Sequence, residues 1–136
     1  MGACEEVPDP RYQPDAMLQR ELGLTPADRV HTVTVTGGPA EAADPEVTEI
    51  AAGVWVQFVS GDWFVHELAF EMDSLGTSAR VFLMDTDQIE SPPLLQRDAR
   101  FVVSFQGAPP GRYPYLLQGN GRAGRGVIVV ADSAGG

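Results

Sequence analysis

Apolar residues occur in this chain as short runs, and glycine or proline stands between most of them. The 136 residues include 15 glycines and 11 prolines, a content that favours many turns and short strands over long helices. The clearest run is residues 30–36, where valines alternate with polar residues until Gly37 and Gly38 end the run. Such alternation is typical of a half-buried strand with the valines on one face. We therefore expect an all-β fold.

Further short runs predict the other strands. They lie at residues 47–50, 54–59, 64–71, 100–105, 113–117 and 126–130, and residues 80–84 are compatible with one more strand. Residues 40–46 are acidic and are expected to form a loop. The spacing of the runs, with turn residues between them, suits a β-sandwich.

The first 29 residues differ from the rest of the chain. Residues 1–14 are acidic and rich in proline, so we expect an extended tail without a core of its own. Asp15 is suited to cap a short helix at residues 16–22 that Gly23 would end, and residues 25–28 read as a capped turn.

The length of the chain suits one compact domain. We expect the tail and helix at 1–29, the sandwich at 30–131 and a flexible tail at 132–136.

The charge argues against one class of partner. The formal net charge is -10 and the isoelectric point is about 4.4, so general attraction to nucleic acid phosphates or to anionic lipid is unfavourable. The acidic residues concentrate in the first 90 residues, whereas five of the nine arginines lie after residue 90. No run of about 18 apolar residues is present, so the sequence predicts no membrane-spanning helix.

Cys4 is the only cysteine, so the chain can form neither an internal disulfide nor a multi-cysteine metal site. Residues 1–6, Met-Gly-Ala-Cys-Glu-Glu, look like the end of a bacterial lipoprotein signal, in which case Cys4 would carry a lipid and anchor the domain to a membrane. The alternative is an incidental cysteine in the tail. The first reading predicts a periplasmic or otherwise extracytoplasmic protein at the membrane periphery, and a true start at Met1 would instead place it on the cytoplasmic face.

From about Glu46 to its end, the chain resembles the cupredoxins of the plastocyanin and halocyanin type, which are small copper-binding sandwich proteins. Three segments carry the resemblance: FVHELAF at 64–70, GRYPY at 111–115 and GNGRAGRGVIVV at 119–130. They are similar to the strand that presents the family's first histidine ligand, to the entry into its last loop, and to its ligand loop and closing strand. The resemblance implies a Greek-key cupredoxin-like β-sandwich, here with a short N-terminal helix and an extended N-terminal tail.

The resemblance also implies a copper site, and here the sequence departs from the family. A blue-copper site uses a thiolate, two imidazoles and a weak thioether, and the family's ligand loop reads C-x2-H-x4-M. At the aligned loop positions this chain has Leu117, Asn120 and Arg125, and only His66 matches a ligand. Leucine offers no donor, and arginine places a permanent cation where the metal would lie. We therefore expect a metal-free fold with no cofactor and no redox activity.

The two histidines and the carboxylates give little support for catalysis. His66 is either a relic at the edge of the core, hydrogen-bonded to a neighbouring loop such as that of Asn120, or a pH-sensitive contact. His31 lies between threonine-rich positions and reads as a solvated strand residue. Phosphate-loop and nucleophile-elbow motifs are absent from the sequence, and pairs of carboxylates such as Asp85 and Asp87 read as solvated faces. We predict that the protein is not an enzyme.

The surface is the remaining basis for a function. In electron-transfer cupredoxins the end that carries the copper loop is the docking face, and the resemblance places Arg112, Arg122 and Arg125 at that end. Arginine suits paired contacts with carboxylates, and Trp63 is a candidate apolar anchor beside a turn. Trp55 and the tyrosines at 113 and 115 read as core residues.

These observations predict a copper-free structural or interaction subunit. It would dock from outside on a membrane complex of electron transport, respiratory or photosynthetic, with the protein subunits of that complex as partners and with membrane contact that is indirect or made through Cys4. Two alternatives stay open. One is a copper-binding or electron-transfer cupredoxin with an atypical site at His66, and the other is a small-ligand binding protein that uses the space among His66, Leu117 and Asn120.

Overall fold

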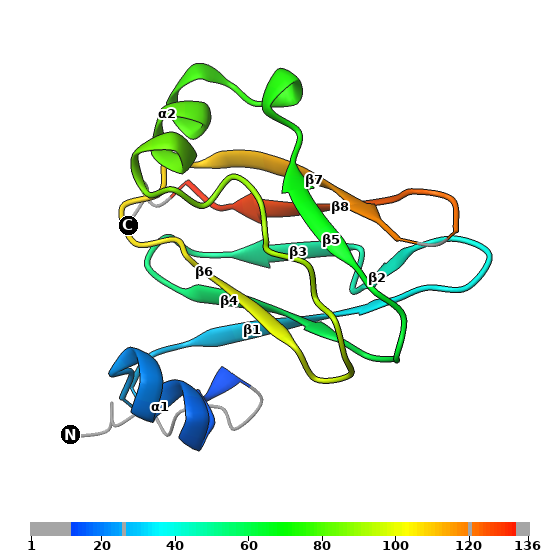
Figure 1. Ribbon diagram of the computed structural model, residues 1–136. Coiled ribbons are helices and arrows are strands. Elements are labelled where there is room, and N and C mark those ends of the chain that lie inside the picture. Colours follow the sequence, from blue (N-terminus) through cyan, green and yellow to red (C-terminus); the bar gives the residue numbers. More distant parts are fainter. Residues whose placement is uncertain (1–11, 26, 120, 133–136) are drawn as a thin grey trace.

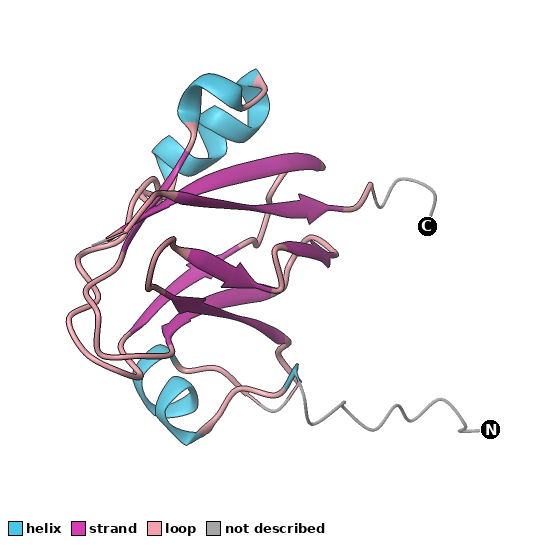
Figure 2. Cartoon of the chain, turned by 90° about the vertical axis from the view of Figure 1, so that its right-hand side faces the viewer, coloured by secondary structure: helices cyan, strands magenta, loops and turns pink. Residues whose placement is uncertain are grey.

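The computed structural model describes residues 12–25, 27–119 and 121–132, and they form a sandwich of two four-stranded sheets (Figures 1 and 2). The first sheet has the order β2-β1-β4-β6 and consists of β1 (Val30–Thr36), β2 (Ala42–Asp44), β4 (Trp55–Ser60) and β6 (Arg100–Ser104). The second has the order β3-β8-β7-β5 and consists of β3 (Val47–Ile50), β5 (Glu67–Phe70), β7 (Gly111–Gln118) and β8 (Gly124–Val130). The prediction of an all-β sandwich is confirmed.

The chain crosses between the sheets several times, as a Greek-key arrangement requires. Strand β1 runs parallel to β4, and β3 runs parallel to β8, whereas the other pairs are antiparallel. Two short helical elements, η2 (Met72–Ser74) and α2 (Thr77–Asp85), lie in the segment that connects β5 to β6. As Figure 1 shows, the loops after β1, β4 and β7 all lie at the end of the sandwich far from α2.

Aromatic side chains fill the space between the sheets. Phe58 of the first sheet meets Tyr115 of the second edge to face, with ring centroids 5.0 Å apart, and Phe70 packs on the same tyrosine at 6.1 Å. All three side chains are almost completely buried. Burial of large aromatic surface is the main favourable contribution to such a core. Tyr113 and Tyr115 are both completely buried, which confirms the prediction that these tyrosines belong to the core.

Helix α1 (Ala16–Leu22) forms where the sequence predicts it, and it covers the outer face of the first sheet. The Asp15 carboxylate accepts the backbone N–H of Leu18, and Gly23 ends the helix in the left-handed conformation. Leu18 packs with Leu24 and Val30 in a second, smaller cluster of buried residues. Val30 therefore faces α1, while the later valines of β1 face the main core, which corrects the expectation that all valines of this strand share one face.

Two elements differ from the sequence-based expectation. The segment 80–84 lies in helix α2, so its reading as a strand is wrong. Ala79 and Leu83, four residues apart, are the buried residues of this helix. Phe82 stacks on Phe105 and meets Tyr113 edge to face. The acidic segment 40–46 contains the short edge strand β2, which pairs with the end of β1. Its residues are exposed or half-buried, so no apolar pattern marks the strand in the sequence.

No helix of the described residues is long and apolar enough to cross a membrane.

Candidate functional site

The loops after β1, β4 and β7 lie at the end of the sandwich opposite α2 (Figure 1), and their residues surround His66. Glu41 lies in the β1–β2 loop, Asp62 and His66 lie between β4 and β5, and Gly119 opens the β7–β8 loop. The backbone of His66 is fixed by two hydrogen bonds with the backbone of Leu94, at 3.1 and 2.7 Å. This bridge to Leu94 therefore fixes the backbone position from which the imidazole extends.

Both ring nitrogens of His66 are bound by carboxylates. Nδ1 lies 2.5 Å from Oε1 of Glu41, and Nε2 lies 2.7 Å from Oδ1 of Asp62. His66 is completely buried and Glu41 is only 4% exposed, whereas the side chain of Asp62 keeps 23% of its surface exposed. We call the three residues the carboxylate clamp. It joins the β1–β2 loop to the β4–β5 loop.

The geometry of the clamp favours the charged form of His66. With both carboxylates ionised, each only accepts hydrogen bonds, so both ring nitrogens act as donors and the imidazole is an imidazolium. Burial of the ring works against its charged form, but the hydrogen bonds to Asp62 and Glu41 raise the pKa of His66 above its ordinary value. The clamp as a whole then carries one net negative charge.

Asp62 also organises the backbone around it. Its Oδ2 accepts the N–H of Gly37 at 2.8 Å, and its Oδ1 accepts the N–H of Phe64 at 3.0 Å. Desolvation opposes ionisation of this carboxyl, but these two N–H groups and the ring of His66 hold the pKa of Asp62 below its usual range. One carboxylate thus connects the end of β1 to the loop between β4 and β5.

The second oxygen of Glu41 lies in a crowded space. Oε2 is buried and has no hydrogen-bond partner among the described residues. A β-carbon built on Gly119 would lie 2.5 Å from this oxygen, and one built on Gly37 would lie 2.8 Å from it. The carboxylate therefore fits only because both neighbours are glycine.

The residues present do not fit a blue-copper ion. Both nitrogens of His66 donate to carboxylates, so neither presents a lone pair to a metal. Leu117, at the position of the family's thiolate, is completely buried in the hydrocarbon core. Arg125 lies on the outward face of β8, where its guanidinium contacts Glu71 at 3.5 Å and is 73% exposed. Asn120 lies outside the described residues. Among the residues that the structure describes, no three histidine, cysteine or acidic side chains form a metal-binding group.

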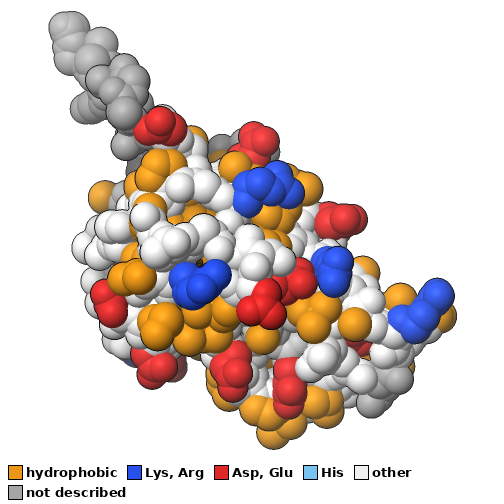
Figure 3. Space-filling model, turned by 90° about the horizontal axis from the view of Figure 1, so that it is seen from above, with side chains coloured by type: hydrophobic (Ala, Val, Ile, Leu, Met, Phe, Trp, Pro, Cys, Tyr) orange, Lys and Arg blue, Asp and Glu red, His pale blue; other side chains and the backbone are white. Residues whose placement is uncertain are grey.

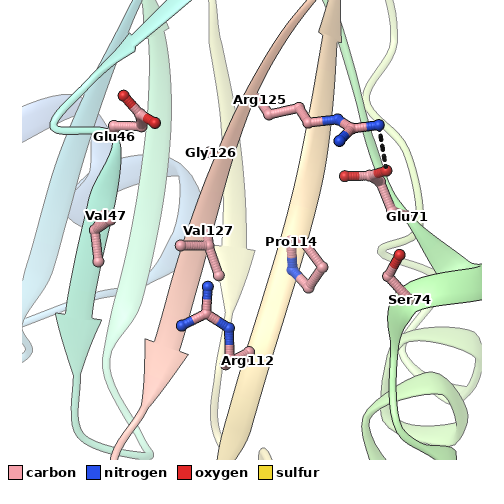
Figure 4. Close-up of a pocket in the computed structure, with 9 residues that line it drawn as sticks. All are labelled: Glu46, Val47, Glu71, Ser74, Arg112, Pro114, Arg125, Gly126 and Val127. Atoms are coloured by element: carbon pink, nitrogen blue, oxygen red, sulfur yellow. Dashed lines mark ion pairs between the residues drawn. The ribbon is translucent and has the colours of Figure 1, made fainter.

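The three arginines expected on one docking face are divided between two places. Arg112 and Arg125 line an open pocket of about 500 Å³ on the outer face of β3, β7 and β8, with Val47, Pro114 and Val127 as its apolar floor (Figure 4). Glu46 and Glu71 line the same pocket, so its charges are mixed, as they are across this side of the molecule (Figure 3).

Arg122 lies instead in the β7–β8 loop, next to the carboxylate clamp. Its backbone carbonyl accepts the N–H of Glu41 at 2.8 Å, and its own N–H donates to the carbonyl of Pro39 at 3.0 Å. Trp63 lies at the same end of the sandwich and is 73% exposed. Partner binding by any of these residues stays a prediction, as does lipidation of Cys4, which lies outside the described residues.

His31 is half-buried rather than solvated, which corrects the sequence-based reading. Its ring lies against Tyr12, with centroids 4.4 Å apart. Burial, together with the charge of Arg29, lowers the pKa of His31 below its ordinary value.

Sequence reasoning missed both carboxylates of the clamp. Asp62 precedes His66 by four residues, a spacing that could have marked it. Glu41 is one of several acidic residues in a segment read as a loop, and nothing in its neighbourhood distinguishes it. The hydrogen bond expected between His66 and a neighbouring loop exists, but its partners are Glu41 and Asp62.

Comparison with solved structures agrees with this fold. A copper-containing nitrite reductase from Thermus scotoductus SA-01 is similar with a TM-score of 0.53 and 25% identity, over 80% of this chain but only 23% of that chain. A Cu(I) form of an amicyanin mutant is similar with a TM-score of 0.50 and 15% identity, over 81% of this chain and 88% of that one. No protein-family model and no curated protein matches the sequence. The fold is cupredoxin-like.

Proposed function

We propose that this cupredoxin-like chain is a copper-free, non-catalytic interaction subunit that docks from outside on a larger membrane complex of electron transport. The observation that carries the proposal is the carboxylate clamp: Glu41 and Asp62 hold both nitrogens of His66, the one residue that matches a copper ligand of the family.

The clamp supports a structural role for this end of the fold. Copper would need a neutral imidazole with a free lone pair and a thiolate close to it. Here a carboxylate lies within hydrogen-bond distance of each imidazole nitrogen, and position 117 is a buried leucine. An ion pair of this kind fixes loops without binding a metal.

The surface next to the clamp supports an interaction role. Trp63, Phe64 and Val65 are consecutive and exposed, and Arg122 lies on the neighbouring loop. Aromatic and arginine side chains contribute most of the binding energy in typical protein interfaces. The resemblance to electron-transfer cupredoxins, which dock through this end, suggests an electron-transport complex as the partner.

Two measurements test the proposal. The purified protein is titrated with Cu(I) and Cu(II), with a copper-binding cupredoxin as the positive control, and we expect no stoichiometric uptake and no thiolate-to-copper absorption. The native membranes are then solubilised gently, and the chain is captured at low and at high salt. We expect a stoichiometric membrane complex that high salt weakens.

Other results would overturn the proposal. Stoichiometric copper with charge-transfer absorption would establish an atypical copper site at His66. A chain recovered alone from membranes at low salt would remove the subunit role, and stabilisation by a small molecule in a thermal-shift screen would then favour ligand binding.

A further inference from the structure

Four exposed apolar side chains gather at the clamp end of the sandwich. Trp63 is 73%, Leu95 67%, Phe64 44% and Val65 40% exposed. Leu95 belongs with the other three because His66 and Leu94 form an antiparallel bridge, which sets their neighbours Val65 and Leu95 opposite each other. We call these four residues the apolar tip. The other large exposed apolar residues of the described chain lie apart from it, on α1, β3 and α2.

Polar contacts, rather than burial, hold the tip in shape. The bond between Asp62 and His66 closes a loop whose three inner residues are Trp63, Phe64 and Val65. The Asp62 carboxylate also accepts the N–H of Phe64 inside this loop. A rigid loop loses little conformational entropy on binding, so pre-organised apolar side chains bind more tightly than flexible ones.

Both charged residues that flank the three consecutive tip residues in the sequence, Asp62 and Glu67, are acidic, and Asp62 is already paired with His66 in the clamp. Glu67 lines a small pocket of about 230 Å³ with Val65, and it shares a second pocket with Glu90. Arg97 and Arg122 follow on the neighbouring loops. An anionic membrane surface would be repelled by the carboxylates nearest to the tip, whereas basic side chains of a protein would be attracted.

We propose that the apolar tip is a protein-docking surface held in shape by the carboxylate clamp, and that its partner presents an apolar pocket with lysine or arginine at the rim facing Glu67. This inference rests on the proposed function, because it names the surface and the partner chemistry of the interaction subunit. Trp63 is the central anchor, and Glu67 selects the charge of the partner.

A displayed library of random peptides tests the partner chemistry with the intact chain as bait. We expect selection to enrich peptides that combine apolar residues with lysine or arginine. Synthetic peptides with the enriched sequences, when added to the protein, should shift the backbone NMR signals of its residues 63–67 and 94–96. Trp63→Ser should weaken their binding at least tenfold, and Glu67→Lys should reverse the preference towards acidic peptides. Met84→Ser, which removes a 57% exposed apolar side chain on α2, is the matched control and should leave binding unchanged.

Three results would overturn the inference. The first is selection that yields no binders or acidic ones, the second is binding that Trp63→Ser leaves intact, and the third is binding of the chain to zwitterionic or anionic lipid vesicles through Trp63. Capture of the variants from native membranes distinguishes failure of this inference from failure of the proposed function. If Trp63→Ser and Glu67→Lys chains still co-purify with that complex, the subunit role stands and this docking surface is wrong.

Discussion

Nδ1 of His66 lies 2.5 Å from Oε1 of Glu41, two residues that are 25 positions apart in the sequence and almost completely buried in the fold. The imidazole that resembles a copper ligand is therefore held by a carboxylate of the protein itself. Removal of one member of a buried, hydrogen-bonded ion pair leaves an uncompensated polar group and is more costly than loss of an exposed pair.

Glu41→Gln should destabilise the protein. The amide keeps the shape of the side chain but loses the charge that pairs with His66, and hydrogen bonds to charged groups contribute about 1.5–3 kcal/mol. We expect a loss of that size in the free energy of unfolding in urea at pH 6. Glu71→Gln is the matched control, because Glu71 forms only a 3.5 Å pair with an exposed arginine, and its effect should be below about 1 kcal/mol. Equal losses for the two variants would contradict the role of the clamp.

The stability should fall as the pH rises above neutral. The pKa of His66 is raised in the folded state from 6.5, so its stabilising contribution is complete below pH 6.5 and is lost as the pH passes through the folded pKa. We expect the free energy of unfolding to be lower at about pH 9 than at about pH 6. The imidazole NMR signals of His66, whose two nitrogens face Glu41 and Asp62, should titrate above those of a model histidine.

Two variants show which histidine causes this pH dependence of the stability. His66→Gln should abolish most of the decrease, because it removes the group whose pKa is raised in the folded state. His31→Gln should retain it, since burial lowers the pKa of His31 and gives that residue a contribution of the opposite sign. A His66 ring that titrates below pH 6.5 in the native protein would show that the clamp does not hold an imidazolium.

The strands were predictable from sequence because their signal is local. The alternation in β1, the glycine-rich turns and the segments around His66 and Tyr113 were sufficient to indicate a cupredoxin-like sandwich. Helix α2 was missed because its buried residues, Ala79 and Leu83, lie among polar and exposed ones, so a short window gives no clear period. Strand β2 was missed because an exposed edge strand needs no apolar pattern.

The site was only partly predictable from the same sequence. His66 could be found because it lies in a strand-like motif, but its partners come from loops that meet only in three dimensions. Arg125 lies close to the last loop, yet the pleat of β8 turns its side chain outward, whereas Arg112 lies opposite Val129, at the end of β7 far from the loop that carries Arg122. Distance along the chain therefore did not reveal which arginines share a surface.

Gly119→Ser should destabilise the protein through a steric clash. Its β-carbon would lie 2.5 Å from Oε2 of Glu41 and 2.8 Å from the carbonyl oxygen of Val65, and overpacking of this kind typically costs about 1–3 kcal/mol. Gly76→Ser is the matched control: a β-carbon there meets no atom within 4 Å, and Gly76 is the N-cap of α2, where serine is preferred. Denaturation in urea measures both variants, and a Gly119→Ser protein as stable as the native one would show that the loop can open away from Glu41.

Two tyrosines of β7 should respond differently to loss of the hydroxyl group. The hydroxyl of Tyr113 donates to the carbonyl of Pro109 at 2.7 Å, so Tyr113→Phe should cost about 1 kcal/mol. The hydroxyl of Tyr115 is buried, lies against Gly126 and has no hydrogen-bond partner among the described residues. Tyr115→Phe removes an unsatisfied polar group and should be neutral or stabilising by up to about 1 kcal/mol. Both variants keep the aromatic packing on the core, so thermal and urea denaturation of the pair isolates the hydroxyl contribution. A loss for Tyr115→Phe equal to that for Tyr113→Phe would mean that a buried water or a rearranged backbone group satisfies the hydroxyl of Tyr115 in solution.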